Sequence, residues 1–142
     1  MTVAAILAGK GRNVLTTTAA TRIADAVGLL ARHKVGALVV VEGERIAGVI
    51  SERDIVRAVA ASGGEALQTP VGSIMTRAVV TCTEAETVND VMTRMTRGRF
   101  RHLPVVADGR LAGIISIGDV VKARIEQVER EAEEMRAYIA TA

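Results

Sequence analysis

Hydrophobic positions along this chain alternate between strand-like and helical spacing, and the resulting order of segments occurs twice. In the first half the pattern predicts, in order, a short helix at 2–8, a strand-like segment at 14–18, a helix that begins after an N-cap at Thr21, a strand at 35–41, its hairpin partner at 46–50, and a helix from Ser51 to about Ala61. The pattern restarts at Val71. The sequence therefore predicts a mixed α/β fold.

The second half repeats the first at a fixed offset of 65 residues. Residues 14–58 and 79–123 are identical at 17 of 45 aligned positions. Both copies contain Gly-x-x-Ser-x-x-Asp, which carries a strand pattern into a helical one at Ser51 and Asp54, and again at Ser116 and Asp119. We expect two α-β-α-β-β-α units that pack about a pseudo-two-fold axis, because units of about 60 residues bury too little surface alone.

Breaks in the periodicity set the boundaries of these units. Residues 63–70 contain two glycines and Pro70, so this segment is predicted to be a linker. The first unit is then 1–62, the second 71–126, and an extended C-terminal helix covers 127–142. A 3-4-3-4 spacing of hydrophobic residues runs into that helix: Ile125, Val128, Ala132, Met135 and Ile139. Such a narrow seam packs against the body of the protein or against a second subunit, and the sequence leaves both open.

Composition narrows the class of protein. With 49% hydrophobic and 24% charged residues, the chain is expected to fold around a core. Two aromatic residues, Phe100 and Tyr138, and a net charge of +2 provide neither the stacking platform nor the dense basic face of a nucleic-acid-binding protein. A single cysteine, no basic region ahead of the first apolar run, and no apolar run of about 20 residues predict a soluble, cytoplasmic protein without membrane contact.

The paired serine and aspartate have two physical interpretations. Ser-x-x-Asp before a helix is a capping arrangement, which stabilises the helix by about 0.5–2 kcal/mol and needs no ligand. A carboxylate in the first turn of a helix can also accept hydrogen bonds from two neighbouring hydroxyls, as in a ribose diol, while the serine lies beside free helix-start amides suited to phosphate. The two roles are compatible.

Other kinds of chemistry are not expected. His33 and His102 lack Cys or carboxylate neighbours at metal-ligand spacing, and Gly9–Arg12 lacks the spacing of a P-loop. Cys82 lies in a predicted strand, where a buried, inert thiol is expected. No nucleophile–base pair can be assembled, so an enzyme is the least favoured class and no catalytic cofactor is expected.

Taken together and in order, these motifs resemble the tandem CBS-domain family, also called the Bateman module. The resemblance rests on the duplicated Gly-x-x-Ser-x-x-Asp, on Ile74-Met75-Thr76, on the Thr81/Thr83 segment and on Arg101-His102-Leu103-Pro104-Val105-Val106. It covers nearly the whole chain and implies a stand-alone, bacterial-type CBS pair. Such modules bind adenine nucleotides and related adenosyl compounds and regulate other proteins, so the resemblance implies AMP as the first expectation, with ATP or NAD(H) as alternatives.

The resemblance also implies which residues bind the nucleotide. Asp119 is expected to hold the ribose, with phosphate contacts from Ser116, Arg101 and His102. Adenine is expected to rest on the first half, against Thr16, Val35, Gly36 and Ala37. A second cleft, at Asp54 and Ser51, ranks lower because Gly36 and Ala37 stand in the first half where Arg101 and His102 stand in the second.

The favoured function is a sensor that binds its nucleotide between the two repeats, acts as a homodimer and signals to an unidentified effector protein. The alternative is a structural or interaction module, in which Ser-x-x-Asp is only a cap and the C-terminal seam docks a partner or a second subunit. Nucleic-acid binding through the arginines at 97–101 is less favoured than either.

Overall fold

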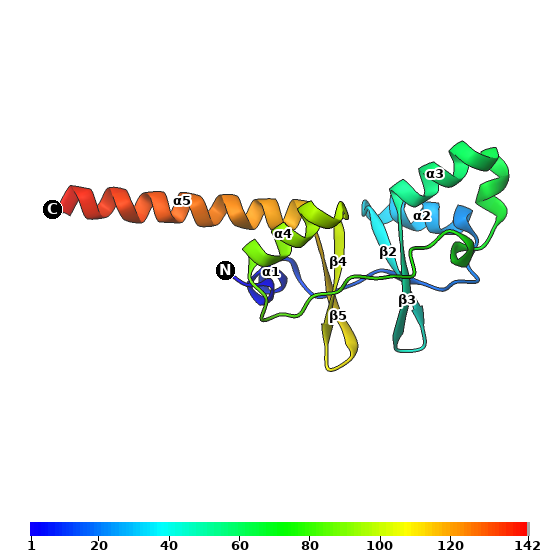
Figure 1. Cartoon of the computed structure of the whole chain (residues 1–142), viewed down its shortest axis with the longest axis horizontal. Coiled ribbons are helices and arrows are strands. Elements are labelled where there is room, and N and C mark those ends of the chain that lie inside the picture. Colours follow the sequence, from blue (N-terminus) through cyan, green and yellow to red (C-terminus); the bar gives the residue numbers. More distant parts are fainter. Residues whose placement is uncertain (142) are drawn as a thin grey trace. The chain divides into compact units, whose positions relative to one another are not determined.

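The computed structural model describes residues 1–141 and confirms a mixed α/β fold (Figure 1). Its elements follow the predicted order: α1 (Val3–Lys10), β1 (Thr16–Thr17), α2 (Ile23–His33), β2 (Ala37–Glu42), β3 (Arg45–Ser51), α3 (Glu52–Ser62), the 3₁₀ helices η1 (Gly63–Gln68) and η2 (Val71–Ser73), α4 (Val88–Gly98), β4 (His102–Ala107), β5 (Arg110–Ser116) and α5 (Ile117–Thr141). Strand and helix bounds lie within a few residues of those expected from the hydrophobic pattern.

The chain folds into two compact units that do not follow the order of the repeats. Unit 1 contains Met1–Arg12, Thr81–Val106 and the chain from Ala112 onward, while unit 2 contains Asn13–Val80 and Ala107–Leu111. The N-terminal helix α1 therefore packs with the second repeat. Its backbone is held there by hydrogen bonds from Val3 N–H to the Glu86 carbonyl, at 2.9 Å, and from Val88 N–H to the Met1 carbonyl, at 3.0 Å.

Unit 2 is built on a three-stranded sheet in the order β1-β2-β3. β1 pairs with β2 in parallel and β2 pairs with β3 antiparallel, so that Ala37 lies opposite Ser51. The core between this sheet and helices α2 and α3 is aliphatic, with the following buried residues: Ile23, Ala26, Leu30, Leu38, Val40, Ile50, Ile55, Val71 and Met75. Val71 and Met75 come from the start of the second repeat.

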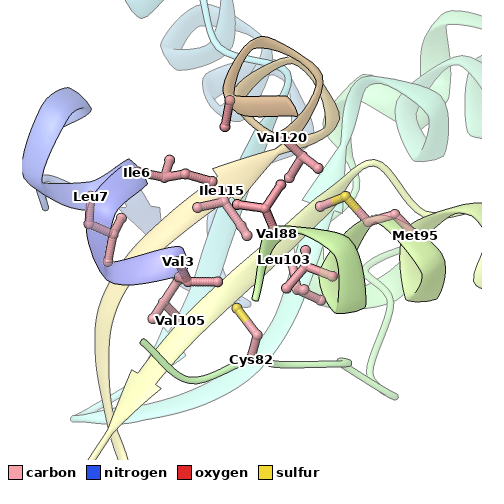
Figure 2. Close-up of a cluster of buried hydrophobic side chains, with 12 residues drawn as sticks. Val3, Ile6, Leu7, Cys82, Val88, Met95, Leu103, Val105, Ile115 and Val120 are labelled. Carbon is pink, nitrogen blue, oxygen red and sulfur yellow. The ribbon is translucent and has the colours of Figure 1, made fainter. Parts of the chain in front are cut away.

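Unit 1 packs α1, α4 and α5 on the two-stranded sheet β4-β5 (Figures 1 and 2). Its buried cluster is Val3, Ile6, Leu7, Cys82, Val88, Val91, Met95, Leu103, Val105, Ile115, Val120 and Ala123. Figure 2 shows Val3 of α1 beside Val105, and Ile6 of α1 pointing toward Ile115. The scarcity of aromatic residues is thus met by aliphatic packing, as the composition predicts.

The expected strand at 79–83 is reduced to a single bridge between Cys82 and Val105. Pro104 accounts for this difference. In unit 2 the N–H of Val39 donates to the Leu15 carbonyl, at 3.2 Å, next to the β1–β2 ladder. Pro104 occupies the position of Val39 in the second repeat. Because proline has no N–H, the equivalent bond cannot form and the ladder does not extend.

The glycine of each Gly-x-x-Ser-x-x-Asp lets a segment from the other repeat pack closely on its strand: α1 packs on β5 at Gly113, and the segment that ends at Thr76 packs on β3 at Gly48. A Cβ at Gly113 would lie 2.8 Å from Leu7 Cδ2 of α1, and a Cβ at Gly48 would lie 2.7 Å from the Thr76 carbonyl oxygen. Thr76 is also paired with Val49 through two backbone hydrogen bonds. Glycine is needed at these two positions because it has no side chain, and not because of its conformational freedom.

One local prediction was wrong. The N-cap of α2 is Arg22 and not Thr21, whose hydroxyl instead lies 3.0 Å from that of Thr18.

The segment at 63–70, expected to be a linker, contains the 3₁₀ helix η1. Ala66 of η1 is buried, and η1 contacts α2 and α3.

The C-terminal helix is long, as the hydrophobic pattern predicts. α5 runs without a break from Ile117 to Thr141, so the expected extension is part of the helix that begins after Ser116. Only its first turns bury side chains, at Val120 and Ala123. The last residue of the expected 127–142 segment, Ala142, lies outside the described residues.

Candidate functional site

In unit 2, Ser51 and Asp54 form a complete capping box at the start of α3. The backbone N–H and the hydroxyl of Ser51 lie 2.9 and 3.0 Å from Asp54 Oδ2, and the Asp54 N–H donates to Ser51 Oγ at 3.3 Å. Both side chains are half-buried. The capping interpretation is therefore confirmed for this copy, and it leaves the question of ligand contact open.

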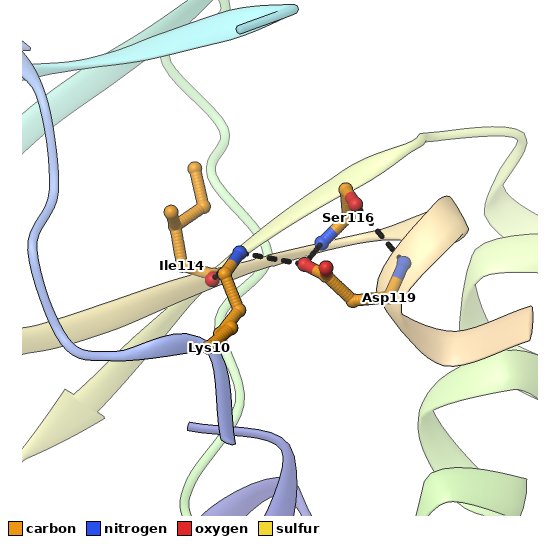
Figure 3. Close-up of polar contacts among 4 residues, drawn as sticks. All are labelled: Lys10, Ile114, Ser116 and Asp119. Atoms are coloured by element: carbon orange, nitrogen blue, oxygen red, sulfur yellow. Dashed lines mark hydrogen bonds and ion pairs between the residues drawn. The ribbon is translucent and has the colours of Figure 1, made fainter. Parts of the chain in front are cut away.

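In unit 1, Ser116 and Asp119 cap α5 in the same way and have an additional partner (Figure 3). The Ser116 N–H donates to Asp119 Oδ2 at 2.8 Å, and the Asp119 N–H donates to Ser116 Oγ at 3.1 Å. The ammonium of Lys10 lies 2.6 Å from the same Oδ2 and also donates to the Ile114 carbonyl oxygen at 2.9 Å. Lys10 thus joins the end of α1 to the start of α5.

Several opposing influences set the pKa of the Asp119 carboxyl. Burial removes water from the carboxylate and by itself raises the pKa, but the hydrogen bonds from Lys10 and Ser116 and the positive charge of Lys10 outweigh burial. The net effect holds the pKa of Asp119 below the ordinary aspartate value. Asp119 is consequently ionised at neutral pH and keeps its ability to accept hydrogen bonds from hydroxyl groups.

Lys10 is the residue that sequence reasoning missed. The spacing of Gly9–Arg12 excludes a P-loop, and no other motif in the sequence gives Lys10 a role. The ion pair depends on α1 packing in the unit of the second repeat, and hydrophobic periodicity contains no information about which unit a helix joins. The repeat offers no signal either, because the first copy of the motif has no equivalent: in the described part of the chain, Asp54 takes part in no ion pair.

The predicted phosphate-binding residues of the second repeat lie at the start of β4. Arg101 is exposed, and its carbonyl accepts a hydrogen bond from the Ile117 N–H at 2.8 Å, which places it beside the first turn of α5. His102, half-buried, is the first residue of β4. Arg101 also lines an open pocket of about 570 Å³, together with Ile117, Gly118, Val121, Lys122, Ile125 and Glu126. The charged residues that line this pocket are therefore two cations, Arg101 and Lys122, and one carboxylate, Glu126.

The predicted adenine-binding residues lie in unit 2. Val35 and Gly36 precede β2 and are half-buried, Ala37 begins β2 and is buried, and exposed Thr16 pairs with Val39 in the sheet. The Gly36 carbonyl accepts a hydrogen bond from the Glu52 N–H at 3.0 Å. This bond is the counterpart of the one between Ile117 and Arg101, so the two copies share this backbone hydrogen bond although both residues that form it differ.

The ten predicted residues therefore form two groups. Ser116, Asp119, Arg101 and His102 come together in unit 1 around the start of α5, and the remaining six lie in unit 2 around the start of α3. Joint binding of one ligand by both groups stays a prediction.

Three further observations concern the described residues. Cys82 is buried, and burial together with the charge of Glu86 raises its pKa to about 11 despite the opposing charge of Arg94, so its thiol is protonated at neutral pH. No group of three or more His, Cys, Asp or Glu side chains within residues 1–141 is arranged to hold a metal ion. No helix in this range has both the length and the apolar character needed to cross a membrane.

Comparison with known proteins agrees with this duplicated architecture. Residues 10–61 and 71–126 each match the family described as CBS domain. The chain belongs to the CBS-domain family. The CBS domain-containing protein CBSX3, mitochondrial, of Arabidopsis thaliana is 37% identical over 97% of this chain and 71% of its own length. The crystal structure of the CBS-domain protein ATU1752 from Agrobacterium tumefaciens has 49% identity and a TM-score of 0.86, covering 87% of this chain and 99% of that one.

Two further CBS structures contain adenosyl ligands. The CBS domain pair of protein MJ0100, in complex with 5′-methylthioadenosine and S-adenosyl-L-methionine, is 27% identical with a TM-score of 0.80, over 89% of this chain and 98% of that one. The CBS domain protein PAE2072 from Pyrobaculum aerophilum, complexed with AMP, is 29% identical with a TM-score of 0.74, over 84% and 89%. CBS pairs are generally regulatory modules, and no catalytic family is indicated for this chain.

Proposed function

We propose that this CBS pair is a regulatory protein that binds an adenine nucleotide between its two repeats and signals its presence to an effector protein. The observation that carries the proposal is the ionised Asp119 carboxylate at the first turn of α5, the turn whose Ile117 N–H donates to the backbone carbonyl of Arg101. A charged acceptor and nearby cations are what a ribose diol and a phosphate require. The ligands of PAE2072 and MJ0100 contain the same adenosyl group.

Each residue has a distinct role in this proposal. Asp119 accepts the ribose hydroxyls, and Ser116, Arg101 and His102 contact phosphate. Adenine rests against Thr16, Val35, Gly36 and Ala37, where small side chains at 36 and 37 leave room for the ring. Asp54 and Ser51 provide a second, weaker site, because no basic pair precedes β2.

AMP is the first ligand proposed, with ATP and NAD(H) as alternatives. Arg101 and Lys122 border a pocket large enough to hold water and a phosphate group, at about 570 Å³. Charge-assisted hydrogen bonds from such cations contribute about 1.5–3 kcal/mol each, enough to separate AMP from adenosine by a measurable factor. We further propose that the protein is a cytoplasmic homodimer.

Thermal melting of the full chain with AMP, ATP, NADH or S-adenosylmethionine tests the proposal. Ligand that binds only the folded form stabilises it by about 2.7 kcal/mol at 100 times the dissociation constant, so the melting temperature should rise with at least one of them. Guanosine monophosphate serves as the control, with the same phosphate and ribose but a different base. An unchanged melting temperature with all four adenosyl compounds would rule the proposal out.

The second candidate is an interaction module without a ligand, favoured by the complete capping boxes and by the exposed hydrophobic residues on α5. It predicts no thermal shift with any nucleotide, together with loss of assembly when Val128 or Met135 is replaced by glutamate. The nucleotide proposal predicts the thermal shift whether or not those substitutions disrupt assembly. The two experiments therefore separate the candidates.

A further inference from the structure

The C-terminal half of α5 presents hydrophobic side chains that its own unit does not cover. Figure 1 shows this helix continuing beyond α1 and α4, against which only its first turns pack. We define the α5 seam as Val121, Ile125, Val128, Ala132, Met135 and Ile139. Met135 and Ile139 are 61% and 66% exposed, and Val121 and Ile125, nearer the body of unit 1, are still 44% and 53% exposed.

The seam has the spacing of a coiled coil. Continuity of α5 from Ile117 adds Val121 to the hydrophobic series, and the steps along the seam become 4-3-4-3-4. This places Ile125, Ala132 and Ile139 at a positions of a heptad repeat, with Val121, Val128 and Met135 at d positions. The seam spans about 27 Å of helix at 1.5 Å per residue.

The charged residues beside the seam favour a second α5 helix as the partner, and they favour a parallel orientation of the two helices. The g positions hold Arg124 and Glu131, and the e positions that follow each of them hold Glu129 and Arg136. In a parallel, in-register pair of α5 helices, each g residue faces the next e residue of the other copy. Arg124 then meets Glu129 of the second copy, and Glu131 meets Arg136 of the second copy. Two-fold symmetry makes each attractive pair occur twice.

An antiparallel pair that matches all six layers of the seam is disfavoured by the same residues. In that arrangement e faces e and g faces g, with the helices centred near residue 130. Glu129 would then lie opposite Glu129 of the second copy, and Glu131 opposite Glu131. Like charges at flanking positions oppose association, whereas the parallel pairing has only opposite charges there.

We propose that α5 pairs with α5 of a second copy of this chain in a parallel, in-register coiled coil along the α5 seam. The inference specifies the interface of the homodimer proposed above and does not depend on nucleotide binding. Pairing would cover Val121 and Ile125, which also line the pocket beside Arg101 and Lys122. The two bodies would emerge from the same end of the coil.

Single-cysteine cross-linking of the full chain determines the direction of pairing. Val121→Cys and Met135→Cys, made separately, should each form a disulfide-linked dimer under mild oxidation, because a parallel pair brings every d residue next to its own copy. Arg130→Cys, on the outer face of the helix, is the matched control and should not. Cys82 is buried and stays unreactive in the folded protein. Cross-linking at only one of the two seam positions, or at neither, would overturn the parallel arrangement.

A charge exchange tests the pairing without cysteines. Arg124→Glu places two glutamates together at each Arg124–Glu129 contact and should weaken dimerisation roughly tenfold in sedimentation equilibrium. Adding Glu129→Arg to that variant restores opposite charges and should restore the affinity. The inference would be refuted if the wild-type chain stayed monomeric at all concentrations. It would also be refuted if the double variant dimerised no more tightly than Arg124→Glu alone. Melting curves with nucleotide on the same variants show separately whether ligand binding persists.

Discussion

Lys10 and Asp119 are 109 residues apart in the sequence, and the Lys10 ammonium lies 2.6 Å from Asp119 Oδ2. The contact exists because α1 packs in the same unit as α5. Oδ2 also accepts a hydrogen bond from the Ser116 N–H, so it already has two donors. A ribose diol that needs both carboxylate oxygens must therefore compete with Lys10. Under the proposed function, ligand binding at Asp119 is therefore expected to depend on the position of α1.

Replacing Lys10 with methionine should reveal that competition. Lys10→Met keeps most of the aliphatic side chain and removes the ammonium, which frees Oδ2 for a hydroxyl group. Adenosine, which has no phosphate to attract the lysine, should bind severalfold more tightly, equivalent to about 1 kcal/mol for a factor of five to ten. Isothermal titration calorimetry measures this change.

Arg12→Met is the control for that variant. It removes a neighbouring cation that is paired with Glu84 and leaves Lys10 in place. Adenosine affinity should then be unchanged. Weaker or unaltered adenosine binding by Lys10→Met would show that Lys10 does not occupy the ribose position and that the competition argument is wrong.

The lowered pKa of Asp119 predicts a pH-dependent contribution to stability. Because the folded-state pKa lies below the unfolded value of about 3.9, the folded state binds fewer protons and is favoured above that pH. The contribution is lost as the pH falls below about 3.9 and through the folded-state pKa. Wild type should exceed Asp119→Asn in free energy of unfolding near pH 7, and the difference should shrink at about pH 2.5. Urea unfolding at both pH values measures it, and an equal difference at both would contradict the prediction.

The two motif glycines should differ in their tolerance of alanine. At Gly48 an added Cβ meets the Thr76 carbonyl oxygen at 2.7 Å, a backbone atom held by its pairing with Val49. At Gly113 it meets a terminal methyl of Leu7 at 2.8 Å, which can rotate. Gly48→Ala should therefore cost about 1–3 kcal/mol and Gly113→Ala less, as measured by chemical denaturation.

Gly9→Ala is the control for these two substitutions. Gly9 lies in α1 with no atom within 4 Å of an added Cβ, and alanine is favoured over glycine in a helix by roughly 0.5–1 kcal/mol. This variant should be neutral or slightly more stable. A Gly113→Ala variant less stable than Gly48→Ala would mean that the Leu7 contact is the more rigid of the two.

The sequence predicted most of the elements and the two Ser-x-x-Asp caps because these features are local. The offset of 65 residues located both Ser-x-x-Asp pairs, and each caps a helix as expected. The sequence did not predict that α1 packs with the second repeat and Val71–Ser73 with the first. Neither segment has a periodic feature that specifies which repeat it joins. The close approaches at Gly48 and Gly113 are consequences of that exchange.

Some differences between the copies are visible in the sequence, but their effect on the structure is not. The ranking of the two aspartates rests on Gly36 and Ala37 compared with Arg101 and His102, and it stays a prediction. The sequence shows that proline occupies position 104. Its effect on the segment at 79–83 follows only from the structure, in which the Val39 N–H donates to the Leu15 carbonyl. Neither a periodic pattern nor a difference between aligned residues of the two copies indicated the role of Lys10.

We propose that Asp119 is the principal ribose-binding residue and that Asp54 is chiefly a helix cap. Isothermal titration calorimetry of AMP with wild type, Asp119→Ala and Asp54→Ala distinguishes the two roles, with circular dichroism to verify that each variant is folded. Asp119→Ala should lower AMP affinity at least tenfold, about 1.4 kcal/mol, and Asp54→Ala should change it far less. An equal loss in both variants, or a larger loss in Asp54→Ala, would contradict it.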